Sequence, residues 1–548
     1  MSLNNLNRVA SLSDATKTHF DLIVIGGGVT GCGIALDASA RGMKTLLVEK
    51  EDYASGTSSK STKLIHGGLR YLKQLEFGLV RETGVERAVV HNLAPHLVHP
   101  EKMFLPIVDQ GTFGKVSASL AISVYDFLAK VEQEDQKESI DKDEAIEVEP
   151  LVKSDFLNGG IIYSEYRTDD ARLTIELIKK AEELGCECFN YLEMLKGIYG
   201  SDGNMTGITC KNFQSGKEYE FRAKVIVSAT GPWVDGIRKK DGSFEGSKLH
   251  LTKGVHIVVE RQKLNLNQSV YFDDFDGRML FAIPRGLITY VGTTDTTYHE
   301  DLDRVVANKE DVDYLLNAVN HFFNINPLSI DDVQSTWAGL RPLIHQEGRS
   351  PTELSRRDEI FKSETGLISI AGGKLTGYRK MAERIVDLVS KKIPEFSDVY
   401  CSTEELVLTR KAFADYDEVK YFIERFEKEV VEANLDKYYS WYLISTYGKD
   451  AKQIFDAMMQ SNEPDNEKGL LLSELDYCVK NEGLLHPLDL LQRRTGRLYF
   501  DINSVKKYYK SVVDASANIF EVDENTKAKW ITEIELAIGD AISFKEEA

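Results

Sequence analysis

Short apolar runs separated by glycine-rich turns dominate the first part of the chain. Residues 20–25 form an apolar run that predicts a buried strand, and Gly26-Gly27-Gly28 interrupts it. Residues 29–41 are small and apolar, which predicts a closely packed helix that Gly42 ends. Residues 44–49 predict a second strand. The pattern therefore indicates a β-α-β unit that starts near residue 20.

Later parts of the chain follow two further patterns. Strand character returns at 225–230 and 367–371, and strands that alternate with turns lie between them, at 255–259, 278–283 and 289–292. This alternation predicts an antiparallel sheet inserted between pieces of the first unit. From about residue 400 amphipathic helix patterns take over, as at 416–435 and 528–542. The last part of the chain is therefore expected to be a separate helical domain.

Composition and charge exclude several classes of protein. The 548 residues are 42% hydrophobic, which is too high for a largely disordered chain. The net charge of −20 argues against nucleic-acid binding, because that function normally requires a basic face. Six scattered cysteines, a polar N-terminus and the lack of an apolar run of about 20 residues predict a reduced, cytoplasmic protein without a signal peptide or membrane span.

The first glycine turn has the context of a dinucleotide-binding fingerprint. Gly26-x-Gly28-x-x-Gly31 follows a predicted strand and opens a helix. Such glycines let the backbone approach a pyrophosphate at the helix N-terminus. Glu49, at the end of the next strand, is placed to accept a hydrogen bond from a ribose hydroxyl. The motif alone does not separate FAD from NAD.

A run of small hydroxyl and glycine residues with added polar groups, residues 56–72, follows the second strand directly. It resembles the signature of the FAD-dependent glycerol-3-phosphate dehydrogenases and oxidases. Further segments similar to this family occur in the same order along nearly the whole chain. They are 35–43, 166–173, 229–233, 252–256, 292–295, 337–343, 372–379 and 487–495.

The resemblance implies an activity and a cofactor. The family oxidises the C2 alcohol of sn-glycerol 3-phosphate to dihydroxyacetone phosphate, with hydride passing to N5 of a non-covalent FAD. The cofactor carries the redox step, while the protein holds the alcohol and takes its proton. The residues expected to bind FAD are Gly26, Gly28, Gly31, Glu49, Thr57, Ser58, Ser59, Ser61, Gly231, Gly373, Lys374, Leu375 and Thr376.

The same resemblance implies a substrate site rich in cations, since a phosphate dianion suits arginine. Its expected members are Arg70, Tyr71, Arg341, Arg356 and Lys374, although Arg357 beside Arg356 leaves that alignment open by one residue. His256 is the first choice for the general base and His66 is its rival. Arg341 is also expected to stabilise the developing alkoxide. No metal site is predicted.

The predicted fold class is mixed α/β (α+β), with a discontinuous Rossmann-like FAD-binding domain, an inserted antiparallel substrate domain and a C-terminal all-helical domain. The FAD-binding parts are placed at 20–105, 161–250 and 336–395. The substrate or cap parts are placed at 106–160 and 251–335, and the helical domain at 401–548.

The electron acceptor is open between two alternatives. Dehydrogenases of this family pass electrons to membrane quinone, whereas α-glycerophosphate oxidases reduce O2 to H2O2. Oxidases of the streptococcal type carry a long insert after the Arg-Pro-Leu segment, but only eleven residues separate Leu343 from Ser355 here. The spacing favours a Bacillus-type dehydrogenase. A flavin-binding protein without turnover and an NAD-linked dehydrogenase are the less favoured alternatives.

A quinone acceptor implies peripheral contact with the inner face of the cell membrane. Candidate basic patches are Arg238 to Lys240, Arg493 and Arg494 with Arg497, and Lys506 to Lys510. The sequence does not fix the oligomeric state, and a homodimer is one expectation.

Overall fold

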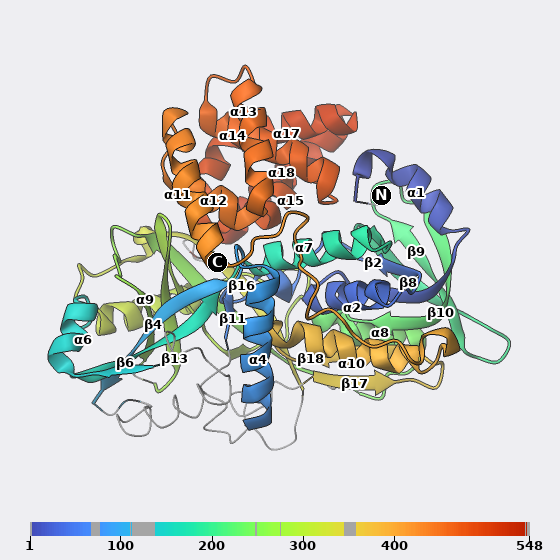
Figure 1. Ribbon diagram of the computed structural model, residues 1–548, viewed down its shortest axis with the longest axis horizontal. Coiled ribbons are helices and arrows are strands. Elements are labelled where there is room, and N and C mark those ends of the chain that lie inside the picture. The colour runs from blue at the N-terminus through green and yellow to red at the C-terminus, as the bar shows by residue number, and fades with distance from the viewer. Residues whose placement is uncertain are drawn as a thin grey trace.

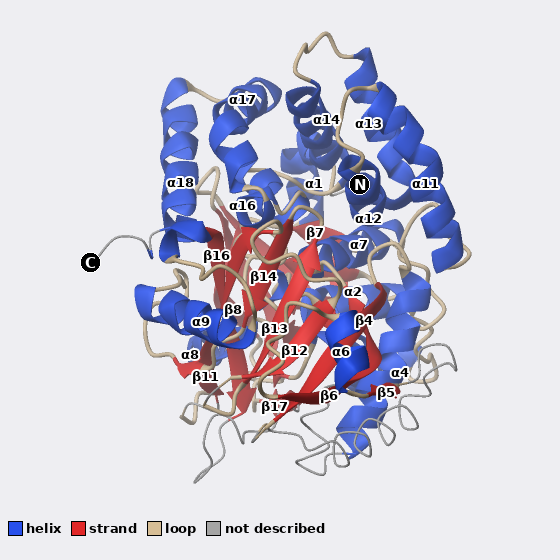
Figure 2. Cartoon of the chain, turned by 90° about the vertical axis from the view of Figure 1, so that its left-hand side faces the viewer, coloured by secondary structure: helices blue, strands red, loops and turns tan. Residues whose placement is uncertain are grey.

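The protein is described by a computed structural model that covers residues 3–66, 77–109, 111, 137–246, 249–274, 276–344, 358–542 and 544. Two sheet regions lie side by side, and the C-terminal helices gather above them (Figure 1). A view from the side shows the same division, with the strands in the lower half and a layer of helices over them (Figure 2).

The first sheet contains the predicted β-α-β unit. Parallel pairing joins β1 (His19–Ile25) to β2 (Thr45–Val48) and to β10 (Glu218–Ser228), and α2 (Val29–Ala40) links β1 to β2. The strand order is β17-β18-β10-β1-β2-β7, with β9 on β10 and β8 on β9. The other strands are β7 (Glu187–Phe189), β8 (Leu192–Tyr199), β9 (Met205–Asn212), β17 (Asp358–Lys362) and β18 (Ile368–Gly372).

Burial explains why β1 reads as a continuous apolar run. Every residue of β1 after His19 is buried, because helices cover one face of this sheet and apolar side chains of β8 and β9 pack with β1 on the other. Helix α2 packs against α7 (Asp170–Glu183) and α10 (Tyr378–Ser390) through its small residues. A Cβ at Gly33, for example, would lie 3.0 Å from the ring of Tyr378.

The second sheet pairs antiparallel except where β12 runs parallel to β4. Its order is β15-β11-β14-β13-β12-β4-β6-β3, with β16 on β11 and β5 on β6. Its strands are β3 (Leu64–Ile65), β4 (His99–Val108), β5 (Glu138–Ile140), β6 (Leu157–Arg167), β11 (Leu249–Glu260), β12 (Ser269–Asp273), β13 (Met279–Arg285), β14 (Ile288–Gly292), β15 (Thr296–Thr297) and β16 (Val333–Ile344).

The C-terminal region is helical and shares a core with the second sheet. Trp337 of β16 packs against Tyr499 and Phe500, with ring centroids 5.7 and 5.8 Å away. The helices of this region are α11 (Tyr416–Glu432), α12 (Tyr438–Tyr447), α13 (Ala451–Gln460), α14 (Asn466–Asn481), α15 (Pro487–Asp489), α16 (Arg497–Phe500), α17 (Ile502–Phe520) and α18 (Glu524–Ile542). Further α-helices of the described residues are α1 (Arg8–Ala15), α4 (Phe77–Leu93), α6 (Lys142–Val148), α8 (Val234–Asp241) and α9 (Lys309–Phe322).

The predicted fold class is confirmed, and most predicted elements fall within a few residues of the observed ones. One prediction about the helical region is wrong. Arg493, Arg494 and Arg497 do not form a basic surface patch, because their side chains are at most 8% exposed and each pairs with carboxylates. None of the described helices has both the length and the hydrophobicity needed to cross a bilayer.

The proposed domain boundaries fall at strands of the second sheet. Strand β4 runs across the boundary at residue 105, β6 across 160 and β16 across 335, and all three pair within the second sheet. The division into domains stays a prediction.

Candidate active site

A cavity of about 550 Å³ lies between the two sheets. On one side it is lined by the turns that follow β1 and β18, at the carboxyl ends of parallel strands. On the other side it is lined by one face of β11 and β16. Ligands of open α/β sheets bind at such strand ends, so the cavity is the candidate site for a dinucleotide and its substrate.

The glycine turn after β1 is held in a shape that requires glycine. Gly26 has a φ of +112°, and a Cβ there would lie 2.6 Å from the carbonyl oxygen of Ala229. A Cβ at Gly31 would lie 1.9 Å from the carbonyl oxygen of Gly26. The turn therefore packs directly on the segment that follows β10 and on the start of α2, and Gly26 and Gly28 line the cavity.

Glu49 closes the turn from the side of β2. Its Oε2 accepts a hydrogen bond of 2.6 Å from the Gly27 N–H, and its Oε1 accepts one of 2.9 Å from the Glu51 N–H. Burial raises the pKa of Glu49 from 4.5 to about 7, while these two N–H groups act in the opposite direction. The carboxyl group faces the cavity, where a ribose hydroxyl could donate to it.

We expect the stability of cofactor-free Glu49→Gln, relative to that of the wild type, to increase as the pH rises. Ionising the buried carboxyl of the folded state costs stability as the pH rises from about 4.5 to about 7, because the unfolded chain binds that proton less tightly. The amide variant lacks this cost, which amounts to up to about 3 kcal/mol. Thermal unfolding of both apoproteins between about pH 5 and pH 8 tests this. A difference in melting temperature that does not change with pH would contradict it.

The remaining predicted cofactor residues also surround the cavity, with two exceptions. The cavity is lined by Gly26, Gly28, Glu49, Thr57, Ser58, Ser61, Gly231, Gly373, Lys374, Leu375 and Thr376. Gly31 instead packs beneath Gly26, and Ser59 is buried with its hydroxyl on the Gly56 carbonyl. The Ser58 hydroxyl accepts a 2.9 Å hydrogen bond from the Val29 N–H at the start of α2.

The register between β11 and β16 places the predicted catalytic residues on one face of the second sheet. His256 pairs with Trp337, Gly254 with Gly339, and Thr252 with Arg341. Side chains two residues apart on a strand share a face. His256 and Arg341 therefore lie on the same face. The glycines between them make room for other groups, since a Cβ at Gly254 would overlap the Arg341 guanidinium and one at Gly339 would overlap Lys60.

His256 is buried and held by two contacts. Its ring stacks on Trp337 at 4.6 Å, and its Nε2 lies 3.0 Å from the hydroxyl of Thr62. Burial, together with the charges of Arg341 and Lys63, holds the pKa of His256 well below 6.5. The imidazole is therefore neutral at physiological pH.

Arg341, Lys374 and His66 also border this end of the cavity. Arg341 donates to the Thr293 hydroxyl at 2.8 Å and to the Thr294 carbonyl at 3.1 Å, and it pairs with Asp295 at 3.3 Å. The carbonyl of His66 accepts hydrogen bonds from the Lys374 ammonium at 3.4 Å and the Thr376 hydroxyl at 3.2 Å. Three predicted substrate residues, Arg70, Tyr71 and Arg356, lie outside the described residues.

Sequence reasoning gave no role to several residues that line the cavity. Thr62 contacts His256 and lies within residues 56–72, the run that resembles the family signature. Its position in that run could therefore have identified it as a site residue. Tyr271 and Phe281 stack at 4.2 Å on β12 and β13. These two occupy ordinary alternating strand positions, and no motif distinguishes them from core aromatics.

The fold and the cavity define a dinucleotide-dependent oxidoreductase, and comparison with known proteins specifies the family. Residues 21–378 match the FAD dependent oxidoreductase family. Residues 370–527 match the C-terminal domain of alpha-glycerophosphate oxidase. Two relatives named aerobic glycerol-3-phosphate dehydrogenase, from Bacillus subtilis and Staphylococcus haemolyticus, are 45% and 44% identical to this chain. These matches cover 98% and 100% of this chain, and 98% and 99% of the relatives.

A solved structure supports the same relationship. The glycerol-3-phosphate dehydrogenase from Bacillus halodurans, determined in complex with FAD, is 38% identical, covers both chains completely and superposes with a TM-score of 0.85. An L-alpha-glycerophosphate oxidase from Mycoplasma pneumoniae shares the fold at 19% identity, with a TM-score of 0.54 over 68% of this chain and 95% of that chain. This chain belongs to the FAD-dependent oxidoreductase family, within the group of aerobic glycerol-3-phosphate dehydrogenases.

The residues present fit FAD. The glycine turn lines the cavity at Gly26 and Gly28, where the fold places a pyrophosphate, and the Glu49 carboxyl stands where a ribose needs an acceptor. The cavity then continues from the glycine turn to the face that holds His256 and Arg341. Its lining therefore provides one region for the cofactor and another for the substrate.

Proposed function

We propose that this chain oxidises sn-glycerol 3-phosphate at C2 to dihydroxyacetone phosphate, with non-covalent FAD as cofactor and membrane quinone as the electron acceptor. The observation that carries the proposal is the arrangement of His256 and Arg341 on one face of the cavity that the dinucleotide turn enters. The activity of the full-length relatives supports the same substrate.

The cations around the substrate end would bind the phosphate. Arg341 and Lys374 both line the cavity, and a phosphate dianion in a partly enclosed site needs such partners. Arg341 keeps its orientation through Thr293 and Asp295, so its guanidinium is preorganised. Arg70, Tyr71 and Arg356 complete the proposed substrate site on the strength of the family resemblance.

His256 would take the proton of the C2 hydroxyl. FAD, when bound, supplies the acceptor for the hydride that leaves C2. A neutral imidazole fixed by Trp337 and Thr62 can hold the hydroxyl proton during this transfer. The nearby Arg341 would stabilise negative charge on the C2 oxygen. His66 is the alternative base, because its side chain also lies at this end of the cavity.

Quinone reduction and H2O2 release, measured side by side in air with sn-glycerol 3-phosphate, test the proposed acceptor. Fast reduction of a soluble quinone analogue with little peroxide supports the dehydrogenase. Stoichiometric peroxide at a comparable rate would identify an oxidase instead. A heat-treated sample and glycerol 2-phosphate serve as controls for non-enzymatic reduction and for substrate specificity.

We also propose peripheral membrane contact, through a surface other than Arg493, Arg494 and Arg497. With Arg493, Arg494 and Arg497 buried, Lys506 to Lys510 on α17 is the better candidate, because Lys506 and Lys510 are exposed and Tyr509 lies between them. Mixed cationic and aromatic residues suit a membrane interface. A cytoplasmic protein on the inner face of the membrane follows from this proposal.

A further inference from the structure

A buried carboxylate just beyond the ribose-binding position is held by the helical region. Asp52 lies three residues after Glu49 and is fully buried. Its oxygens accept hydrogen bonds from Arg493 at 2.6 Å and from Arg494 at 2.8 and 3.0 Å. Asn190, in the turn between β7 and β8, donates a further one at 3.0 Å. These bonds connect two parts of the chain more than 400 residues apart.

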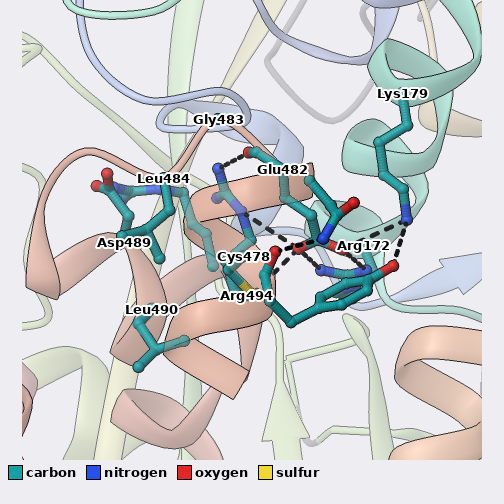
Figure 3. Close-up of polar contacts among 12 residues, drawn as sticks. Arg172, Lys179, Cys478, Glu482, Gly483, Leu484, Asp489, Leu490 and Arg494 are labelled. Atoms are coloured by element: carbon teal, nitrogen blue, oxygen red, sulfur yellow. Dashed lines mark hydrogen bonds and ion pairs between the residues drawn. The ribbon is translucent and has the colours of Figure 1, made fainter. Parts of the chain in front are cut away.

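The two arginines are themselves fixed by other buried groups. Arg493 donates to Asp489 at 2.6 Å, and Arg494 donates to the Glu482 carbonyl at 2.8 Å. The carboxylate oxygens of Glu482 in turn accept hydrogen bonds from both terminal nitrogens of Arg172, at 2.6 and 2.8 Å. Figure 3 shows Arg172 and Lys179 of α7 reaching Glu482 beside Arg494. The helical region is thus joined to the dinucleotide-binding sheet by one continuous buried network.

The charges of this network balance among the described residues. Its cations are Arg172, Lys179, Arg493 and Arg494, and its carboxylates are Asp52, Glu176, Glu482 and Asp489. The two arginines hold the pKa of Asp52 at about 2 although burial alone would raise it. Removing one partner leaves a buried charge uncompensated, which is strongly unfavourable.

A steric path also runs from the helical region to the glycine turn. Gly483 packs on Tyr53, since a Cβ at Gly483 would lie 3.2 Å from that ring. Tyr53 packs on Gly27, where a Cβ would lie 2.9 Å from the same ring. The Ala54 N–H donates a 3.0 Å hydrogen bond to the Gly27 carbonyl. Segment 49–54 is therefore held between the helical region and the turn that faces the cavity.

We propose that Asp52, Arg493 and Arg494 are positioning residues for the adenosine end of FAD, so that the helical region completes the cofactor site. They touch neither the cavity nor its lining turn directly, and they act by fixing segment 49–54. This segment presents the Glu49 carboxyl and supports Gly27. The inference rests on FAD binding and not on the identity of the substrate or the electron acceptor.

The test is the binding of ADP, which carries only the adenosine and pyrophosphate parts of the cofactor, to the full-length apoprotein. Calorimetric titration of Asp52→Asn and Arg493→Lys should show at least about tenfold weaker ADP binding than in the wild type, as for other residues that orient a binding group indirectly. FAD binding should weaken by the same factor. At saturating FAD, the visible flavin spectrum should stay unchanged.

Arg497→Lys is the matched control. Arg497 is buried in the helical region and donates to Ser504 at 2.7 Å while pairing with Glu474 and Glu467. Among the described residues, the hydrogen bonds and ion pairs of Arg497 all stay within the helical region, so its replacement should lower the melting temperature without changing ADP affinity. If Asp52→Asn does not fold, Arg493→Lys, which keeps the charge, decides the question alone.

Two results would overturn the inference. The first is unchanged ADP affinity in Asp52→Asn and Arg493→Lys. The second is an equal loss of affinity in Arg497→Lys, which would show that any weakening of the helical region has this effect. Because no substrate is present, failure of the proposed dehydrogenase activity would leave the titration result unaffected.

Discussion

Replacing Gly26 by alanine is expected to yield a folded protein that no longer retains FAD. The φ of +112° at Gly26 is unfavourable for any residue with a Cβ, and the new methyl group would lie 2.6 Å from the Ala229 carbonyl oxygen. The backbone conformation alone costs about 1–3 kcal/mol in a non-glycine residue. The overlap is with main-chain atoms of Ala229 and Thr230, just after β10, so the glycine turn itself must move to relieve it. Affinity for FAD should fall at least about 100-fold.

Gly42→Ala is the matched control for this experiment. Gly42 also has a positive φ, +84°, and lies in the same β-α-β unit, but a Cβ there would meet nothing within 4 Å. The positive φ makes alanine unfavourable at both positions, but only Gly26→Ala distorts the turn proposed to hold the cofactor. The ratio of flavin to protein after purification and the FAD titration of the apoprotein are the measurements. Equal FAD retention in the two variants would contradict the assignment of this turn.

Replacing His256 by asparagine should lower kcat by about 10²- to 10⁴-fold, the range typical of removing a general base. FAD content should not change, because His256 lies on β11, away from the glycine turn. The pKa of His256 is held well below 6.5, so the base stays unprotonated throughout the neutral range. The wild-type kcat/KM should therefore show no loss of activity near pH 6.5 that depends on His256.

Two variants separate the base from its alternatives. His250→Asn removes a histidine of the same strand that contacts Thr297 and does not line the cavity, so its kcat should stay near the wild-type value. His66→Asn tests the rival base. If His66→Asn lost more activity than His256→Asn at saturating substrate, the assignment of the base would be reversed.

The local parts of this structure could be predicted from the sequence. The strand at 20–25, the glycine turn and the helix that follows form a contiguous unit, and its turn geometry requires glycines that the sequence displays directly. The same holds for amphipathic helices such as α11 and α18, whose patterns match the observed bounds closely.

Contacts between segments that are distant in the sequence could not be predicted from local patterns. The pair Arg493-Arg494 has the composition of a surface patch, and its burial depends on Asp52 and Glu482, which no local pattern connects to it. The parallel pairing of β12 with β4 likewise joins segments separated by more than 150 residues. Tyr271 and Phe281 reach the cavity only because the strands carrying them are neighbours in the second sheet. Family resemblance, by contrast, pointed to His256 and Arg341, and both line the cavity.

Anaerobic addition of sn-glycerol 3-phosphate to the purified holoprotein tests the central claim most directly. We expect the visible absorbance of the flavin to decrease, with formation of one dihydroxyacetone phosphate per flavin. A flavin that remains oxidised with this substrate, while dithionite still reduces it, would contradict the proposed dehydrogenase activity.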